Sequence, residues 1–461
     1  MLNLQSNFPG KNWKHPNPLL QSAWNWTRIG FAAFPLFPLI GVIAILTALV
    51  QTWRQAGIEV IQSRFNWGFA LLAICLIILS ITTPHPFDSF VGLANFVPYF
   101  CFFAAFSTLI CSPEQLRQLA WILLLPAMPV MLLGWLQFLG LGGTVAFPLL
   151  PANVWEIAVG GNPLGRMSSV FVHANSLAAY LQMVFIFTIG LLMDTYDQSR
   201  RMRERQDISL TANRTNLLFW KSTTVLWLLA LLLLSVSSIV MTSSRAAWGG
   251  ILLTSLIFTI YQGWYWILSI ITATATVILG AAYAPNPLKQ ILRSTVPRYF
   301  WARITDEMYP NRPESITRLS QWKFAWKMTQ ERPLTGWGLQ SFGPLYQDYA
   351  HVWLGYPHNL LLMLTSNIGI PATIVLLGLV GWILGKGTYL FINFPLEWRS
   401  ERTIFFTYLV AFTGFIIFNI ADVTALELRL NTHAWLILAG IYGLASRATQ
   451  KSITEFDDLK A

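Results

Sequence analysis

The stretch KSTTVLWLLALLLLSVSSIVMT at residues 221–242 decides the class of fold. Its length is close to the roughly 20 apolar residues that an α-helix needs to cross the hydrocarbon core of a bilayer. Similar runs recur along the whole chain. Of the 461 residues, 55% are hydrophobic and 11% are charged, whereas soluble domains usually contain about 25% charged residues. The composition therefore predicts an all-α polytopic membrane protein and excludes a soluble enzyme, a disordered chain and a nucleic-acid-binding domain.

The apolar runs set the number of expected membrane spans. Pro35 and Pro38 interrupt the first run and can break a helix, so we expect that run to fold as a short hairpin. The sequence thus predicts about 11 or 12 transmembrane helices. The runs lie at 29–50, 68–83, 89–111, 117–140, 172–193, 221–242, 246–261, 264–284, 358–385, 403–420 and 431–446.

Basic residues between the runs predict the orientation. They gather in segments that share one side of the membrane, and the positive-inside rule makes that side the cytoplasm. Lys11, Lys14 and Arg28 favour the same side, which the hairpin would allow because it places both chain ends in the cytoplasm. The other basic residues are Arg54 and Arg64, Arg200, Arg201, Arg203, Arg205 and Arg214, Lys386, Arg399 and Arg402, and Arg447, Lys451 and Lys460.

The long segment 285–357 is then expected on the opposite side, as one large periplasmic loop. It separates the N-terminal transmembrane helices (1–284) from the C-terminal helices and cytoplasmic tail (358–461). The loop carries nine Lys and Arg but five Asp and Glu. Long loops cross the membrane largely regardless of charge, so this basic excess has a local reason, such as an anionic ligand.

Arg245 follows the quoted stretch directly, in MTSSRAAWGG, and the next apolar run begins at once. Only a tight external turn can hold an arginine at this place. Its guanidinium matches phosphate oxygens in a bidentate fork, and charged groups at membrane depth are usually functional. The alternative interpretation is an arginine whose charge reaches out to the lipid headgroups.

The loop contains ESITRLSQWKFAWKM, which predicts an amphipathic helix beginning near Pro313. Such a helix lies on the membrane surface or caps a cavity. Arg318 either contacts headgroups with the rest of the basic face or points inward to a phosphate. The glycines of the following RPLTGWGLQSFG permit sharp turns, but the lysine of a nucleotide-binding loop is missing. The predicted apolar stripe consists of Ile316, Leu319, Trp322 and Trp326.

His358 lies in YPHNLLLMLTSNIGIP, at the outer mouth of the next span. An imidazole at the membrane–water boundary can act as a general base near neutral pH, although a lone histidine also fits a structural role. Asn359, next to it, can bond the ring or a ligand hydroxyl.

Two further polar groups lie on the same side. GNPLGRMSSVFVHANSLAAYL contains Arg166, His173 and Asn175, which either line the same cavity or form a structured entry to the helix. ADVTALELRLNTHAW contains Arg429, which can simply pair with Asp422. The chain has no HExxH motif and no CxxC among its three cysteines, so it offers no strong metal ligand set and predicts no cofactor.

Four pieces of the sequence, taken in order, resemble the O-antigen ligase and polymerase family. The resemblance implies a C-type glycosyltransferase, multi-pass in the bacterial inner membrane, with its active site facing the periplasm. It also implies a glycan donor linked to undecaprenyl diphosphate, a lipid or glycan acceptor, and no metal. The pieces are GRMSSVFVHANSLAAYL at 165–181, SSRAAWGGILL at 243–253, RPLTGWGLQSFG at 332–343 and PHNLLLMLTSNIGIP at 357–371.

The resemblance assigns Arg245 and Arg318 to the donor diphosphate and His358 to the base that activates the acceptor hydroxyl. Arg166, Asn359 and Arg429 are secondary candidates.

A competing interpretation comes from D-x-T-x-x-x-x-R-x-N-x-x-x-W at 422–435, which resembles related proteins described as bicarbonate transporters. Such a transporter would use Arg245 as an anion site. A third option is a non-catalytic component that binds or flips a lipid-linked glycan. The sequence has no inverted repeat, and its polar groups gather on one face, which favours the enzyme.

Overall fold

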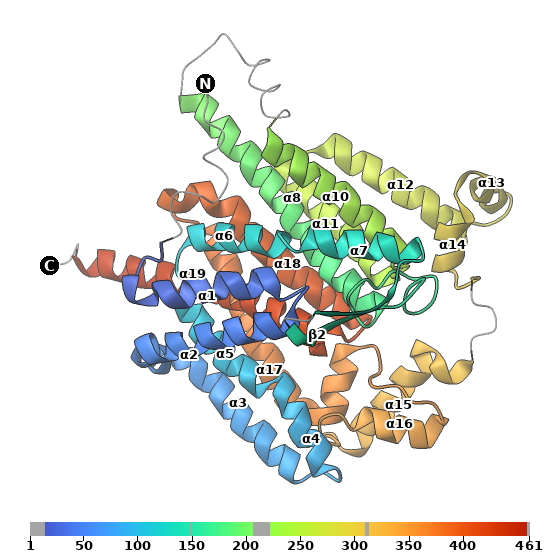
Figure 1. The fold of residues 1–461 in the computed structure, drawn as a ribbon, viewed down its shortest axis with the longest axis horizontal. Helices are drawn as coiled ribbons and strands as arrows, with labels where there is room; N and C mark the ends of the chain where they lie inside the picture. Colours follow the sequence, from blue (N-terminus) through green and yellow to red (C-terminus); the bar gives the residue numbers. More distant parts are fainter. Residues whose placement is uncertain (1–13, 148–149, 206–221, 309–312, 459–461) are drawn as a thin grey trace.

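The computed structural model describes residues 14–147, 150–205, 222–308 and 313–458. Lys11, Arg214 and Lys460 of the basic clusters lie outside these ranges. The described chain is almost entirely helical, and the exception is an antiparallel hairpin of β1 (Gly143–Phe147) and β2 (Leu150–Ile157). Figure 1 shows long helices packed side by side, with short helices gathered at one end. The prediction of an all-α polytopic membrane protein is confirmed.

The helices of the bundle, long and short, follow the predicted apolar runs. They are α1 (Gln21–Ala33), α2 (Pro38–Gln62), α3 (Arg64–Ile81), α4 (Pro86–Gly92), α5 (Val97–Leu109), α6 (Pro113–Leu124), α7 (Ala127–Phe138), α8 (Ala174–Arg205), α10 (Thr223–Met241), α11 (Arg245–Gln262), α12 (Tyr265–Tyr283), α17 (Leu360–Ile392), α18 (Arg402–Ile420) and α19 (Leu428–Asp458).

Within the described ranges, nine helical segments are long and apolar enough to cross a membrane. The sequence predicted more, and three helices explain the difference. α11 begins at Arg245 and ends at Gln262, so polar ends lower its mean hydropathy. α19 has polar residues in its first turns and continues into a polar tail. α1 has 13 residues, which span about 20 Å and are too short to cross.

The first apolar run is broken where its prolines predicted a break. α1 ends at Ala33, and α2 begins at Pro38, which tolerates the first helical position because no amide donor is needed there. The two helices pack against each other as a hairpin (Figure 1). Gly41 allows this close approach, because a Cβ there would lie 2.6 Å from Phe34. The side of the membrane that holds the chain ends stays a prediction.

The core is formed by α19 with α5, α8 and α18 around it. Leu436, Ile437 and Leu438 are consecutive in α19 and are all buried, so this helix is apolar on every side and enclosed by protein rather than by lipid. α8 and α18 approach so closely that a Cβ at Gly190 would lie 2.1 Å from Thr407. By contrast, α12 at the edge of the bundle is mostly exposed.

Four short helices lie between α12 and α17: α13 (Leu288–Thr295), α14 (Arg298–Ile304), α15 (Arg318–Glu331) and α16 (Phe342–Ala350). The predicted amphipathic helix is α15, and its predicted apolar stripe is not the face that packs on protein. Leu319 is 61% exposed and Trp326 is 50% exposed. The buried face instead carries Ala325 and Met328, which pack on Phe342 of α16.

The Gly-rich turn holds this segment against α17. Gly369 interrupts α17, because its φ of 77° and ψ of 167° are not helical. Two residues later, Pro371 lacks the amide N–H that would donate to the carbonyl of Asn367. The turn supplies the missing partners: Gly338 N–H donates to the Asn367 carbonyl at 2.9 Å, and Trp337 N–H donates to the Ser366 carbonyl at 2.9 Å. The turn therefore has a structural role, which fixes α15 relative to the start of α17.

Gly369→Ala is expected to destabilise the protein. The φ/ψ region of Gly369 is essentially restricted to glycine and costs other residues about 1–3 kcal/mol, and a Cβ there would lie 2.4 Å from the Leu334 carbonyl oxygen. Gly378→Ala in the same helix is the matched control, because a Cβ there meets nothing within 4 Å and alanine favours a helix by up to about 1 kcal/mol. Thermal unfolding in detergent measures both variants. Equal midpoints would show that the break does not hold the turn.

Candidate functional site

Asp422 is the centre of a polar cluster at the end of the bundle that carries the short helices. It follows α18 and is 1% exposed. Its carboxylate accepts from the Val423 amide at 2.8 Å. One carboxylate oxygen lies 2.8 Å from His358 Nδ1, and the other accepts from the side-chain amide of Asn175. Three segments distant in sequence therefore meet at one carboxylate.

The Asp422 contact sets the tautomer of His358. An ionised carboxylate only accepts, so Nδ1 must carry the proton, and Nε2 of the neutral ring keeps its lone pair. His358 has φ 49°, a left-handed conformation that is uncommon for residues other than glycine. Strained backbone of this kind clusters at functional sites. The ring of Tyr356 contacts His358 edge-on at 5.2 Å, which further limits the orientation of the imidazole.

Arg318 points toward the same carboxylate. α15 begins at Arg318, after a cap in which the side chain of Thr317 accepts from Ser320 N–H. One guanidinium nitrogen of Arg318 lies 3.8 Å from Asp422 Oδ2, and its side chain is 33% exposed. The Arg318 guanidinium therefore lies at the same buried carboxylate that contacts His358.

Arg166 connects the cluster to the turn before α11. Its terminal nitrogen donates to the Asn175 side-chain oxygen, and its Nε donates to the Thr242 carbonyl at 2.8 Å. The backbone N–H of Asn175 donates to Nδ1 of His173 at 3.2 Å. The group at 165–181 therefore joins the cluster at Asp422.

Arg245 begins α11 on the far side of this turn. It forms an ion pair with Asp306 at 3.0 Å, and Arg303 contacts the other oxygen of Asp306 at 3.4 Å. Arg303 also donates to the Ser243 carbonyl at 2.9 Å. The side chain of Asp306 is 42% exposed, so the carboxylate that neutralises Arg245 is accessible from outside.

An apolar cavity of about 620 Å³ leads away from Arg245. A second apolar cavity of about 650 Å³ continues it, because the two share Phe185, Val236 and Ile271. Together they run between α8, α10, α11 and α12, which lie side by side in Figure 1. The result is an apolar groove with a guanidinium at one end.

The two remaining candidates have structural partners. Arg429 pairs with Glu427 at 2.9 Å, not with Asp422, and it also donates to the carbonyls of Pro35 and Val170. The Asn359 side chain accepts from Leu362 N–H at 3.0 Å as the cap of α17 and donates to the Ile420 carbonyl at 2.9 Å. Asn359 thus fixes the start of α17 to the end of α18.

Asp422 is the residue of the cluster that sequence reasoning did not assign to the site. A pair with Arg429, which is close in sequence, was one possibility, whereas the partners of Asp422 are His358, Asn175 and Arg318. One signal pointed to it: an isolated acidic residue at the end of an apolar run is expensive at a membrane boundary and usually functional.

The charges of the cluster shift its pKa values. Burial alone would raise the pKa of Asp422, but the hydrogen bond and charge of His358, with the charge of Arg318, hold it below its ordinary 3.8. Burial lowers the pKa of His173, and the charge of Arg166 adds to this. Burial, with the Asp422 charge, raises the pKa of Tyr356 to about 12. At neutral pH, Asp422 is therefore ionised and His173 is neutral.

This shift predicts how stability depends on pH. Because the pKa of Asp422 is depressed in the folded protein, the ionised carboxylate stabilises the fold above pH 3.8, and this contribution is lost as the pH falls through the lower folded pKa. Asp422→Asn removes the contribution. The difference in unfolding midpoint between wild type and Asp422→Asn should shrink as the pH falls below about 4. A difference that grows below pH 4 would contradict the assignment.

Comparison with known proteins decides which family carries these features. Residues 229–377 match the family model described as O-antigen ligase. These residues are similar to the O-antigen ligase family over less than half of the chain. Arg245, Arg318 and His358 lie inside the matched range, while Asp422 and Arg166 come from outside it. No protein with a curated description matches the chain.

The similarity to the O-antigen ligase family and the long apolar helices together identify the chain as a multi-pass membrane protein with a glycosyltransferase-like domain. The match gives no support to the bicarbonate transport interpretation. Among the described residues, no group of three His, Cys, Asp or Glu is placed to hold a metal ion.

Proposed function

We propose that the protein is a glycosyltransferase of the bacterial inner membrane. It moves a glycan from undecaprenyl diphosphate to an acceptor hydroxyl on the periplasmic face and requires no metal. One observation carries the proposal: the His358–Asp422 pair lies beside Arg318, and the histidine and arginine both lie in the range that is similar to the O-antigen ligase family.

The His358–Asp422 pair supports the role of His358 as general base. The oxygen of the acceptor hydroxyl attacks the anomeric carbon, and its proton passes to Nε2 of His358. The imidazolium that forms is stabilised by Asp422 at 2.8 Å, as in other His–carboxylate pairs. The bond from the anomeric carbon to the diphosphate oxygen breaks, and the diphosphate leaves with the electron pair. Attack from the opposite face inverts the anomeric centre.

The departing diphosphate gains negative charge, and arginines can stabilise it. The Arg318 guanidinium lies 3.8 Å from Asp422, which also contacts His358, and would contact the phosphate oxygens of a bound donor there. Arg245 is held by Asp306, so a bound diphosphate would compete with this carboxylate. Arg166 joins the Asp422 cluster to the turn before Arg245 and positions the two parts of the site.

The apolar groove supports a prenyl donor. It begins at Arg245 and is lined almost entirely by apolar side chains from α8, α10, α11 and α12. A long isoprenoid chain gains free energy in proportion to the apolar surface that it buries. The groove would hold this chain while its diphosphate lies at the arginine, which brings the anomeric carbon toward His358.

The test is the envelope glycan profile of a strain that lacks the gene. Surface glycan should be lost or shortened and should return with wild type but not with His358→Ala, provided that both proteins reach the membrane in equal amount. The band pattern then separates ligation from polymerisation. Unchanged glycans in the deletion strain would overturn the proposal.

A further inference from the structure

A polar cavity, separate from the two apolar cavities, lies at the end of the helices opposite His358. It has a volume of about 550 Å³ and is lined by residues of α2, α5, α17 and α19. α17 begins at Leu360, close to His358, and also supplies Lys386 to the cavity. At a rise of 1.5 Å per residue, Leu360 and Lys386 are separated by about 39 Å of helix. The hydrocarbon core of a bilayer is about 30 Å thick, so the cavity lies near the other membrane boundary.

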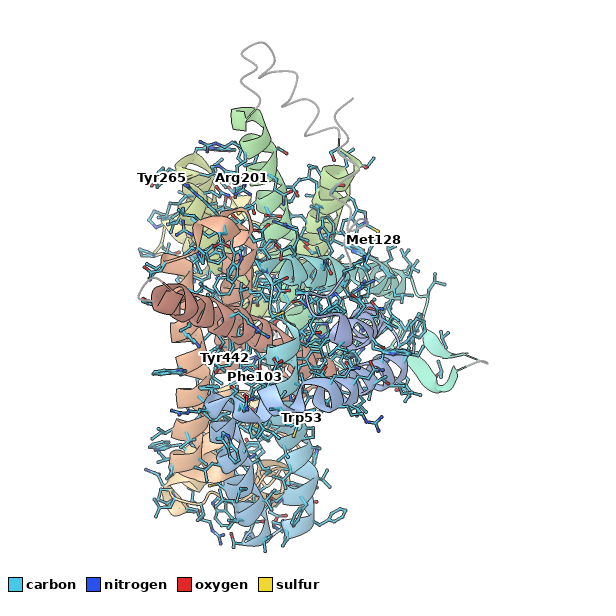
Figure 2. All side chains as sticks on the ribbon, turned by 90° about the vertical axis from the view of Figure 1, so that its left-hand side faces the viewer. Trp53, Phe103, Met128, Arg201, Tyr265 and Tyr442 are labelled. Carbon is cyan, nitrogen blue, oxygen red and sulfur yellow. The ribbon has the colours of Figure 1, made fainter. Side chains whose placement is uncertain are left out.

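Lys386 is a half-buried cation in this cavity. Its Nζ donates to Ser446 Oγ at 3.1 Å and lies 5.0 Å from the centre of the Tyr442 ring. Figure 2 shows Tyr442 next to Phe103, where α19 meets α5, with ring centres 5.5 Å apart. Among the side chains that the structure describes, Glu59 is the carboxylate that lines this cavity, and it pairs with Arg447 rather than with Lys386. A partly desolvated ammonium without a counter-ion is expensive, so an anion at this place would stabilise it.

The rest of the lining fits a phosphate group. Arg447 pairs with Glu59 at 3.4 Å, and both side chains are about half exposed. With Lys386, the three charged residues leave an excess of one positive charge. Ser446 accepts its hydrogen bond from Lys386, which leaves its own hydroxyl proton to donate to an anion. Cations and hydroxyls around one cavity are the groups that bind phosphate oxygens.

The surroundings favour a phosphate that belongs to a lipid. Ile58 and Ile61 of α2 flank Glu59 and are 75% and 55% exposed, so apolar helix surface borders the cavity and can contact acyl chains. Trp67 is 62% exposed and donates to the Ile61 carbonyl at 3.0 Å, as expected of an aromatic residue at a membrane interface. Basic pockets between transmembrane helices bind anionic headgroups.

We propose that this cavity binds the phosphate of an anionic phospholipid, in the membrane leaflet opposite the candidate active site. The lipid headgroup forms an ion pair with Lys386 and accepts from Ser446, and its acyl chains lie along α2. The site is independent of glycan transfer.

The experiment is native mass spectrometry of the full chain, purified in detergent and titrated with phosphatidylglycerol. Wild type should retain phosphatidylglycerol in preference to phosphatidylcholine. Lys386→Met, which removes the charge and keeps the length, should weaken retention about fivefold, the effect of one basic residue near an anionic headgroup. The matched control is Arg54→Gln, which removes an exposed basic residue of α2 that does not line the cavity.

Several outcomes decide the proposal. If Lys386→Met fails to fold, Arg447→Gln at an exposed position provides the same comparison. Equal retention by wild type and the variant, or an equal loss in Arg54→Gln, would overturn the site. Inorganic phosphate is the second probe. If millimolar phosphate displaces the lipid from wild type and also binds alone with the same dependence on Lys386, the site binds free phosphate and not a lipid headgroup.

Discussion

His358→Ala is expected to lower the rate of glycan transfer about 10²- to 10⁴-fold, the usual contribution of a positioned general base. The variant removes the imidazole that lies 2.8 Å from Asp422 and leaves Arg318 and Arg245 in place. Donor binding should therefore change little. The measurement is transfer by purified protein in nanodiscs, with donor binding measured on the same samples.

Asp422→Asn separates a base from a merely structural histidine. The asparagine amide has nearly the shape of the carboxylate, but it can donate to Nδ1 and so place the ring proton on Nε2, the wrong tautomer for a base. We expect a loss of transfer comparable to that of His358→Ala, and the double variant should be no slower than either single one. Independent, multiplying losses would contradict the shared role of the two residues.

The sequence predicted the helices well because apolar length and proline position are local properties. The break at Pro35 and the start of α11 at Arg245 were both expected. On α15, both faces carry apolar residues, so the sequence does not show which face packs on protein. Only its partner decides which face is buried, and α16 covers Ala325 and Met328 rather than Leu319. The β hairpin was missed as well, because it lies in a short connection between apolar runs, interrupted by prolines and without a strong alternating pattern.

The cluster around Asp422 could be predicted only in pieces. His358 and Arg318 were named from their motifs, but the carboxylate between them belongs to another segment. Its role depends on three chain segments meeting in space. A single sequence does not encode that meeting as a local pattern. Arg429, by contrast, looked like a ligand residue and is enclosed by carbonyls and Glu427.

The second large effect is expected on donor binding at Arg245, where two substitutions should change the affinity in opposite directions. Arg245→Ala should weaken donor binding about tenfold to a hundredfold, since a hydrogen bond to a charged group contributes about 1.5–3 kcal/mol. Asp306→Asn should have the opposite effect. The Asp306 carboxylate lies 3.0 Å from Arg245 and must be displaced or shared when a diphosphate binds, so its removal should tighten donor binding several-fold.

Donor binding is measured with undecaprenyl diphosphate in nanodiscs at two salt concentrations. Lys327→Ala is the control, because it removes a basic residue of α15 that does not line the groove and forms an exposed pair with Glu331, 3.9 Å apart. If general electrostatic attraction holds the donor, Lys327→Ala should bind the donor as weakly as Arg245→Ala. A specific contact leaves Lys327→Ala near wild type and makes Arg245→Ala less sensitive to salt than wild type. If Asp306→Asn weakens binding, Asp306 holds Arg245 in its binding geometry and does not compete with the diphosphate.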